Sequence, residues 1–195
     1  MELILGLLIG AALVIAAVTA RARLLDFGAQ TPGDYTVDQP TFDIKQHLNG
    51  AIACEGVIFG PTGRVSSRFV AEFHAEWEGN TGRMTERFRY DSGTTQNREW
   101  HLTLDENGKI IANAADLVGA GTGQQAGSGV CLKYRIQLPE SAGSHQLDVV
   151  DWMYLVENGT IINRSQFRKF GIKVGELVAT MRPLDPAEAI RRDAA

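Results

Sequence analysis

The sequence predicts an all-β domain, an up-and-down antiparallel barrel of eight to nine strands, carried on an N-terminal transmembrane helix. Three observations support this prediction. An uncharged apolar run opens the chain, alternation of apolar and polar residues fills residues 51–182, and short Gly-containing turns separate the alternating segments. No segment between them has the length and pattern of a crossover helix, so consecutive strands are expected to pair antiparallel.

The first element is a membrane anchor over residues 1–25. Residues 3–20 contain no charged side chain, and a helix of that length rises about 27 Å, close to the hydrocarbon thickness of a bilayer. A cleaved signal peptide is the alternative, but the positive residues that should precede the apolar run are missing. Arg21 and Arg23 follow the run and Glu2 precedes it, which by the positive-inside rule places the domain in the cytoplasm.

The rest of the chain divides into three parts. Residues 26–40 are rich in Gly, Pro, Asp and Thr and are expected to form a linker. Residues 41–183 form the barrel domain, which begins with a short helical turn over 42–48. Residues 184–195 form a short C-terminal helix or tail, with Asp185 at its N-cap and Pro186 at its first position.

Nine strands follow one another in the barrel domain. Their expected ranges are 51–59, 64–78, 83–91, 96–104, 109–116, 130–138, 146–156, 160–170 and 172–182. A long antiparallel meander avoids exposed edges best by closing into a barrel, and lipocalins are the version of that barrel that holds a small ligand. The glycine-rich segment 117–129 has no Lys and opens no helix, so it is expected to be a mobile loop at the barrel mouth and not a phosphate loop.

Composition excludes several classes of function. The net charge is −4 and no basic block accumulates, so nucleic acid is not an expected partner. The four histidines show no metal-ligand spacing, no Ser-nucleophile motif is present, and we expect no metal, no cofactor and no assigned catalytic residue. Cys54 and Cys131 either form a disulfide or are two buried thiols, and the second interpretation is favoured.

One face of the first strands stays apolar from hairpin to hairpin and is expected to face inward. A three-residue loop, Asp91-Ser92-Gly93, carries this face into Trp100 and places Glu86 directly opposite Arg98. A carboxylate and a guanidinium on an apolar face form either a buried salt bridge that fixes the register or the site of a ligand headgroup. Both interpretations require the same geometry.

A second polar group lies on either side of Asn158-Gly159, which is expected to form a two-residue hairpin turn. That turn places Asp151 opposite Gln166 and diagonal to Arg164 on one face. The other face carries Trp152, Tyr154, Asn163 and Ser165. With a simple preceding loop, the face of Trp152 is the inner one. Asp151, Arg164 and Gln166 then form a secondary polar cluster on the barrel exterior, where an ion pair contributes about 0 to 1 kcal/mol.

A set of short motifs is spread over most of residues 27–182. They are Asp34-Tyr35, the Gly50 and Gly56 segment, Glu86-x-Phe88-x-Tyr90-x-x-Gly93, Arg98-x-Trp100, Ala115-Asp116-x-Val118-Gly119, Asp151-Trp152-Met153-Tyr154, Asn163-Arg164 and Lys169-Phe170-Gly171-x-x-x-Gly175-Glu176. Together they resemble the bacterial domain-of-unknown-function family numbered 3833. The resemblance implies a lipocalin-like, or calycin, barrel attached to the bacterial envelope as a lipoprotein, and it implies no activity.

The chain departs from that pattern because no cysteine precedes Cys54, so the N-terminal helix must anchor the domain to the inner membrane. The resemblance also implies a periplasmic domain, whereas the arginine bias implies a cytoplasmic one.

The leading functional hypothesis is a membrane-tethered barrel that binds an apolar small molecule, such as a fatty acyl or isoprenoid lipid. The expected ligand-binding residues are Glu86, Arg98, Trp100, Tyr90, Tyr134, Trp152, Tyr154 and Asn163. The first alternative is a lipid-modifying enzyme of the isomerase, cyclase or hydratase type, with Glu86 as acid/base. The second is a packed barrel that acts as the structural partner of a membrane protein.

Overall fold

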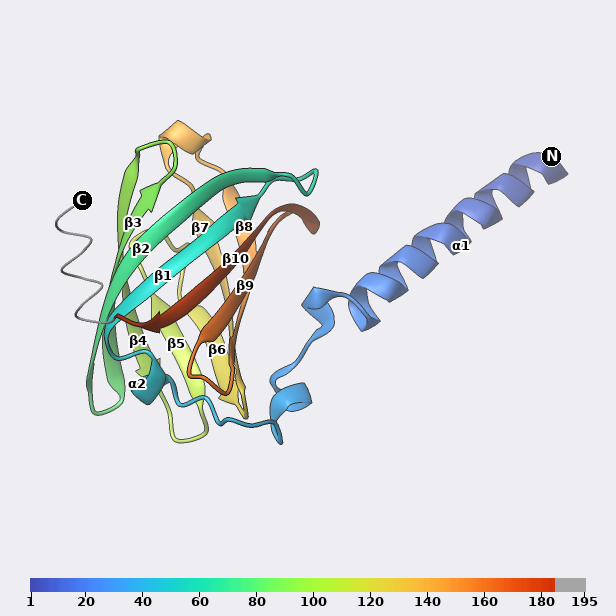
Figure 1. Cartoon of the computed structure of the whole chain (residues 1–195). Helices are drawn as coiled ribbons and strands as arrows, with labels where there is room; N and C mark the ends of the chain where they lie inside the picture. The colour runs from blue at the N-terminus through green and yellow to red at the C-terminus, as the bar shows by residue number, and fades with distance from the viewer. Residues whose placement is uncertain (185–195) are drawn as a thin grey trace.

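The computed structural model describes residues 1–184 and contains a closed barrel of ten antiparallel strands (Figure 1). Each strand pairs with its neighbours in sequence, and β10 pairs with β1 to close the ring. The strands are β1 (Gly50–Phe59), β2 (Val65–Glu78), β3 (Thr81–Tyr90), β4 (Thr95–Leu104), β5 (Lys109–Asn113), β6 (Gly121–Ala126), β7 (Gly129–Gln137), β8 (Gln146–Leu155), β9 (Ile161–Lys169) and β10 (Ile172–Pro183). The predicted lipocalin-like, up-and-down architecture is confirmed, with one strand more than expected.

The helices lie outside the barrel wall or at its ends. They are α1 (Glu2–Leu24), the 3-10 turns η1 (Phe27–Ala29), η2 (Pro32–Tyr35) and η3 (Glu140–Ala142), and α2 (Ile44–His47). The segment Glu2–Arg21 of α1 has a mean hydropathy of 2.7 and none of it is buried, so it is long and apolar enough to cross a membrane. A signal sequence would have the same properties. The expected C-terminal helix, with its N-cap at Asp185, lies outside the described residues.

The additional strand, β6, corrects the expected mobile loop over 117–129. Its glycines stand where larger neighbours come close: a Cβ at Gly123 would meet the carbonyl oxygen of Cys131 and the Leu132 side chain at 2.4 Å. At Gly121 a Cβ would lie 3.0 Å from the Cβ of Tyr134. Because side chains of β7 cover these positions, a strand here requires glycine and therefore shows no alternation in the sequence.

The two ends of the barrel differ. At one end α2 closes the interior, with Phe42, Ile44 and Leu48 all at most 2% exposed. The backbone N–H of Phe42 donates to the carbonyl of Gly127, and the N–H of Ile44 donates to the Gln125 side chain, which fixes this plug to β6. We call this the closed end. The opposite end, formed by the β1–β2, β3–β4, β7–β8 and β9–β10 connections, is the open end (Figure 1).

The predicted inner face of the first strands is confirmed. Its members belong to one core cluster or pack against it: Ile52, Cys54, Ile58, Phe69, Ala71, Phe73, Ala75, Trp77, Met84, Phe88, Tyr90, Trp100, Leu102 and Leu104. Val65 is the exception and is 42% exposed at the open end. The Asp91–Gly93 loop is also confirmed, because the N–H of Tyr90 donates to the carbonyl of Thr94 across it.

The predicted register of β8 against β9 is wrong by one residue. Val156 donates to the carbonyl of Thr160, so the loop has three residues, Glu157-Asn158-Gly159, and not two. Met153 therefore lies opposite Asn163, and Trp152 lies opposite Arg164. The connection before β8 also differs by one residue from the simple loop expected, because Gln146 lies opposite Gln137 and not Leu138. Since side chains alternate along a strand, this second difference exchanges the two faces of β8 and turns Asp151 inward.

Gly93 offers a test of the loop that carries the inner face from β3 to β4. Its φ is +83°, and a Cβ there would meet nothing within 4 Å, so the cost of a side chain is purely conformational. We expect Gly93→Val to lower the free energy of unfolding by about 1 to 2 kcal/mol, measured as a shift in the urea midpoint. Gly93→Asn is the matched control and should lose less, because Asn tolerates the left-handed conformation. Equal midpoints for Gly93→Val and the wild type would contradict the loop geometry.

Candidate ligand-binding site

A belt of polar side chains crosses the inside of the barrel, between the apolar core of the closed end and the open end. We call it the polar belt. Its members, all from inward-facing positions or the loop after β5, are Glu86, Arg98, Asp116, Tyr134, Asp151, Asn163 and Ser165. Burying such groups is costly unless they find partners, so the hydrogen bonds of the belt decide what else it can bind.

Glu86 and Arg98 lie opposite each other on β3 and β4, as the sequence predicts. The ion pair of Arg98, however, is made with Asp116, at 2.9 Å between Nε and Oδ2. Glu86 instead accepts a hydrogen bond of 3.2 Å from the indole N–H of Trp100. The expected salt bridge between Glu86 and Arg98 is therefore replaced by one to a loop residue that closes on Arg98.

Two polar atoms of this pair are buried and have no partner. They are Oε2 of Glu86 and Nη2 of Arg98. Glu86 as a whole is 8% exposed, and the Arg98 guanidinium lies over the Trp100 ring at 4.0 Å from its centroid. An unsatisfied buried polar atom costs about 1 to 3 kcal/mol, so two of them on residues that lie opposite each other indicate a place where a polar group of a ligand would be stabilised.

Asp151 organises the far side of the belt. Its carboxylate accepts hydrogen bonds from Ser165 at 2.8 Å, from Asn163, and from the Tyr134 hydroxyl at 3.4 Å. The Tyr134 ring also packs edge-on against Trp100, with 5.2 Å between centroids. Tyr134 therefore links the Asp151 group to the Glu86 and Arg98 group across the barrel.

Burial shifts the acid–base properties of the belt. Desolvation raises the pKa of Glu86 to about 7, although the nearby Arg98 charge and the Trp100 hydrogen bond oppose the shift. Burial also raises the pKa of Asp151 against the opposing effect of its Ser165 and Asn163 hydrogen bonds. Glu86 is thus partly protonated near neutral pH and can donate as well as accept.

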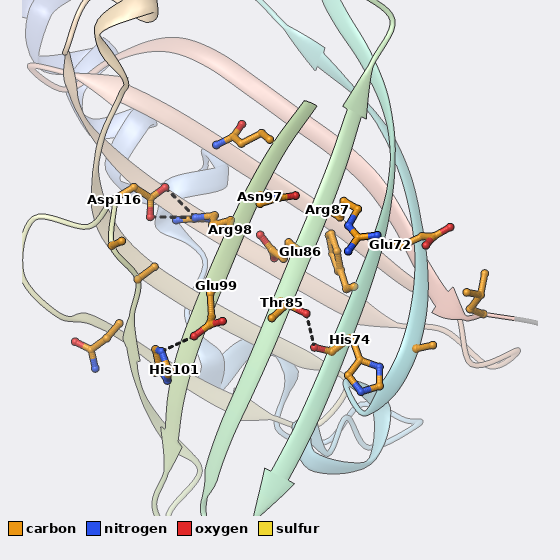
Figure 2. A pocket seen from close by; sticks show the side chains of 17 residues that line it. Glu72, His74, Thr85, Glu86, Arg87, Asn97, Arg98, Glu99, His101 and Asp116 are labelled. Carbon is orange, nitrogen blue, oxygen red and sulfur yellow. Dashed lines mark hydrogen bonds and ion pairs between the residues drawn. The ribbon is translucent and has the colours of Figure 1, made fainter. Parts of the chain in front are cut away.

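The barrel wall is incomplete beside Arg98. In the part of the chain that the structure describes, β4 pairs with β5 only over His101–Leu104. The chain beyond β5 bonds to β7 instead, because Gln137 N–H donates to the carbonyl of Asp116 and Val118 N–H donates to that of Arg135. The first half of β4 therefore has no backbone partner on this side, and the Arg98–Asp116 ion pair crosses the resulting seam (Figure 2).

A hollow of about 850 Å³ lies at this seam and along β2, β3 and β4. Its lining includes inward-facing Glu86 and Arg98 as well as outward-facing Thr85, Asn97 and Glu99 (Figure 2). The hollow thus lies mainly on the outer side of β2, β3 and β4 and extends to Arg98 and Asp116 at the seam.

Space also remains at the open end. Inward-facing side chains there are partly exposed although strands surround them: Ile58, Phe88, Tyr90, Tyr134 and Leu177. The core of the closed end, by contrast, is packed, with Ile52, Ile110 and Ile161 each 1% exposed. Aromatic and aliphatic walls above a few converging polar groups are the usual composition of a small-molecule site.

Trp152 and Tyr154 do not belong to this interior, which corrects their predicted place. They lie on the outer face of β8, covered by residues of the linker, and Trp152 packs with Phe27, Tyr35 and Cys131. Trp152 is fully buried and its ring lies 5.1 Å from that of Tyr35. The tyrosine hydroxyl of Tyr154 donates to the Gln30 side chain at 2.8 Å.

The expected secondary cluster is divided by the wall. Asp151 faces inward, whereas Arg164 and Gln166 lie outside and both bond to Glu176, Arg164 at 2.7 Å. The predicted exterior ion pair between Asp151 and Arg164 is therefore wrong, because Arg164 pairs with Glu176. Asn163 does lie inside as predicted, and its side-chain amide donates to the Asp151 carboxylate and to the carbonyl of Trp152.

The sequence pattern does not identify two residues of the polar belt, Asp116 and Ser165. Asp116 lies in the expected strand over 109–116, but β5 ends at Asn113 and Asp116 is in the loop after it, where only the proximity of Arg98 reveals its role. The predicted register puts Ser165 on the face of Trp152. The one-residue error between β8 and β9 therefore hides its contact with Asp151.

The fold is shared with solved structures of low sequence identity. An S-type phycobiliprotein lyase from Guillardia theta superposes with a TM-score of 0.52 at 7% identity, over 73% of this chain and 91% of the lyase. The protein Rv2717c from M. tuberculosis superposes with a TM-score of 0.53 at 16% identity, over 76% of this chain and 99% of that protein. At these identities the similarity supports the barrel fold.

Sequence comparisons give a family but no characterised relative. No curated protein matches the chain. One family model, described as a protein of unknown function, matches residues 22–183, which include the linker and the whole barrel. The chain therefore belongs to the family DUF3833.

Proposed function

We propose that this protein binds an apolar small molecule inside the open half of the barrel, with a polar end of that molecule at Glu86 and Arg98. The observation that carries the proposal is the pair of buried, unpartnered atoms, Glu86 Oε2 and Arg98 Nη2, beneath partly exposed aromatic walls. Buried polar atoms are nearly always hydrogen-bonded, so two unpartnered ones on facing residues favour a ligand site, although Nε1 of Trp152 in the packed outer cluster is also unpartnered.

The chemistry of the two atoms limits the ligand. Nη2 of Arg98 donates only, and Glu86 with its pKa of about 7 can donate through its protonated form. A carboxylate or carbonyl oxygen would accept from both. The ligand class that fits is a lipid with an oxygen-bearing end, such as a fatty acid or an oxidised isoprenoid, with its apolar part directed to the open end.

The location follows from α1. We expect α1 to remain on the mature chain and to hold the barrel at a bacterial inner membrane, where such lipids are abundant. The phycobiliprotein lyase shares the barrel, which supports a role in small-molecule binding for the architecture without naming the ligand.

A second candidate is acid/base catalysis on the bound lipid by Glu86. The observation in its favour is the pKa of about 7, which lies in the range of an effective general acid or base. It would be supported if the wild type and Glu86→Gln carried lipids of different mass.

Native mass spectrometry of the detergent-extracted chain tests binding. We expect a bound apolar compound on the wild type, and about tenfold or greater loss of its signal in Arg98→Met, because a charge-assisted hydrogen bond of 1.5 to 3 kcal/mol is removed. Arg89→Met is the matched control, since Arg89 lies on the outer face of β3, is exposed and does not line the hollow. A wild type without any adduct would contradict the proposal, and an undiminished adduct in Arg98→Met would contradict the role of Arg98.

The pKa of Glu86 predicts how stability depends on pH. The folded state binds the proton of Glu86 more tightly than the unfolded state, in which the carboxyl has its ordinary pKa of 4.5. Protonation of Glu86 therefore favours the folded state by about 3 kcal/mol. This contribution to the free energy of unfolding is complete below pH 4.5 and is lost as the pH rises through about 7. Urea titrations across this window should show a flatter pH profile for Glu86→Gln. Parallel profiles would show that Glu86 does not titrate there.

N-terminal sequencing of the protein in the membrane fraction tests the anchor. The mature chain should still contain residues 2–24, because α1 is long and apolar enough to act as an uncleaved anchor. A chain that begins at Arg21 would show a cleaved signal instead. Reporter fusions to the C-terminus would then assign the side of the membrane, cytoplasmic by the arginine bias.

A further inference from the structure

The tip of hairpin β9–β10 presents an aromatic side chain that neither packing nor backbone preference explains. Phe170 and Gly171 form a two-residue turn between the paired residues Lys169 and Ile172, with φ of +52° and +77°. Turns of this type favour Asn, Asp or Gly at the first position, and a bulky residue there is a rare outlier. Phe170 is 91% exposed. A strained residue that makes no interior contact is a reason to look for a function.

Phe170 has apolar neighbours on the same rim. Ile172 is 69% exposed beside it, and Val65 on the adjoining hairpin β1–β2 is 42% exposed. The two hairpins are neighbours because β1 pairs with β10 up to Phe59 opposite Glu176. We call Val65, Phe170 and Ile172 the apolar rim. Two exposed cations, Arg64 and Lys173, flank it.

The end of the anchor is tied to this part of the barrel. One residue after Leu25, the Asp26 carboxylate forms an ion pair of 2.9 Å with Arg168 on β9. The next residue, Phe27, is buried, and the Arg164 guanidinium lies 4.5 Å from its ring centroid. The linker expected at residues 26–40 is therefore not a free tether where it leaves α1. Arg168 precedes Phe170 by two strand residues, about 7 Å along the chain.

This connection limits where the rim can lie when α1 spans a bilayer. The polar headgroup layer on each side of the hydrocarbon is only about 5 to 8 Å thick. A chain that leaves the hydrocarbon at the end of α1 and bonds at once to β9 holds the hairpin tip at about that depth. Hairpins β1–β2 and β9–β10 project toward the side from which α1 leaves the barrel (Figure 1).

We propose that the apolar rim inserts into the bilayer that α1 spans and holds the open end of the barrel against the membrane surface. The inference rests on the anchor of the proposed function and goes beyond it, because it assigns an orientation and a second lipid contact. An aromatic side chain is well placed at the interface between headgroups and hydrocarbon, and Arg64 and Lys173 would contact anionic headgroups. A lipid could then pass between the bilayer and the barrel without crossing water.

Spin labels on the full chain test this orientation. The native thiols do not interfere, because Cys54 and Cys131 are free, 2% and 3% exposed, and burial raises the pKa of both. One variant carries a nitroxide at Ile172→Cys, which keeps Phe170. The matched control carries it at Glu106→Cys, an exposed loop residue between β4 and β5 at the closed end. Both are reconstituted in vesicles of phosphatidylcholine and phosphatidylglycerol in equal amounts.

The label at residue 172 should be accessible to oxygen and shielded from a water-soluble nickel chelate, and the label at residue 106 should show the reverse. Adding Phe170→Ser to the Ile172→Cys variant should raise nickel access severalfold, because the inserted ring is lost. Equal nickel access at residues 172 and 106, in protein that sediments with the vesicles, would overturn the proposal. Unchanged nickel access at residue 172 after Phe170→Ser would overturn the role of Phe170.

The same samples separate this proposal from lipid binding in the barrel. A shielded label at residue 172 in protein that carries no lipid by native mass spectrometry would remove the proposed binding function and leave the membrane contact. A bound lipid together with a label exposed to water would remove the membrane contact and leave the proposed binding function.

Discussion

Closure of the ring by pairing of β1 with β10 is the constraint on which the rest of the structure depends. Once the ring is closed, every strand has two neighbours, and the alternation of side chains assigns each residue to the inside or the outside. A shift of one residue in any hairpin would then move charged side chains into the core. Hairpin loops with glycine in the left-handed conformation, at Gly93 and Gly159 among others, keep these registers fixed.

The polar belt exists because this closed interior is not uniformly packed. Near α2 the core excludes water, and hydrophobic burial there stabilises the barrel. Halfway along, five strands and the loop after β5 contribute polar groups that satisfy one another except at Glu86 Oε2 and Arg98 Nη2. The seam beside β4 adds to this contrast, since an ion pair between side chains replaces the backbone ladder there. Such a wall opens at less cost than one held by a full ladder of hydrogen bonds.

The outside of the barrel is used as well. Phe27 and Tyr35 cover Trp152 and Tyr154 on the outer face of β8, so the segment after α1 packs on the barrel with a small apolar core of its own. Asp26 with Arg168 and Gln30 with Tyr154 add polar contacts at its edges. These contacts hold the segment after α1 against the barrel wall, so it is not a flexible connection.

The sequence by itself determined the local elements of this protein. Its alternation located nine of the ten strands, its glycines marked the turns, and the apolar run of residues 3–20 identified α1. Glu86 opposite Arg98 followed from one loop, because pairing in a hairpin depends on a few neighbouring residues. Only the tertiary structure decided which side of β8 faces inward, since the connection over 138–145 is compatible with Gln146 opposite either Gln137 or Leu138, and the difference exchanges the faces of Trp152 and Asp151. Only the tertiary structure brought Asp116 to Arg98 and Phe27 to Trp152, because such contacts join segments distant in sequence that no local pattern relates.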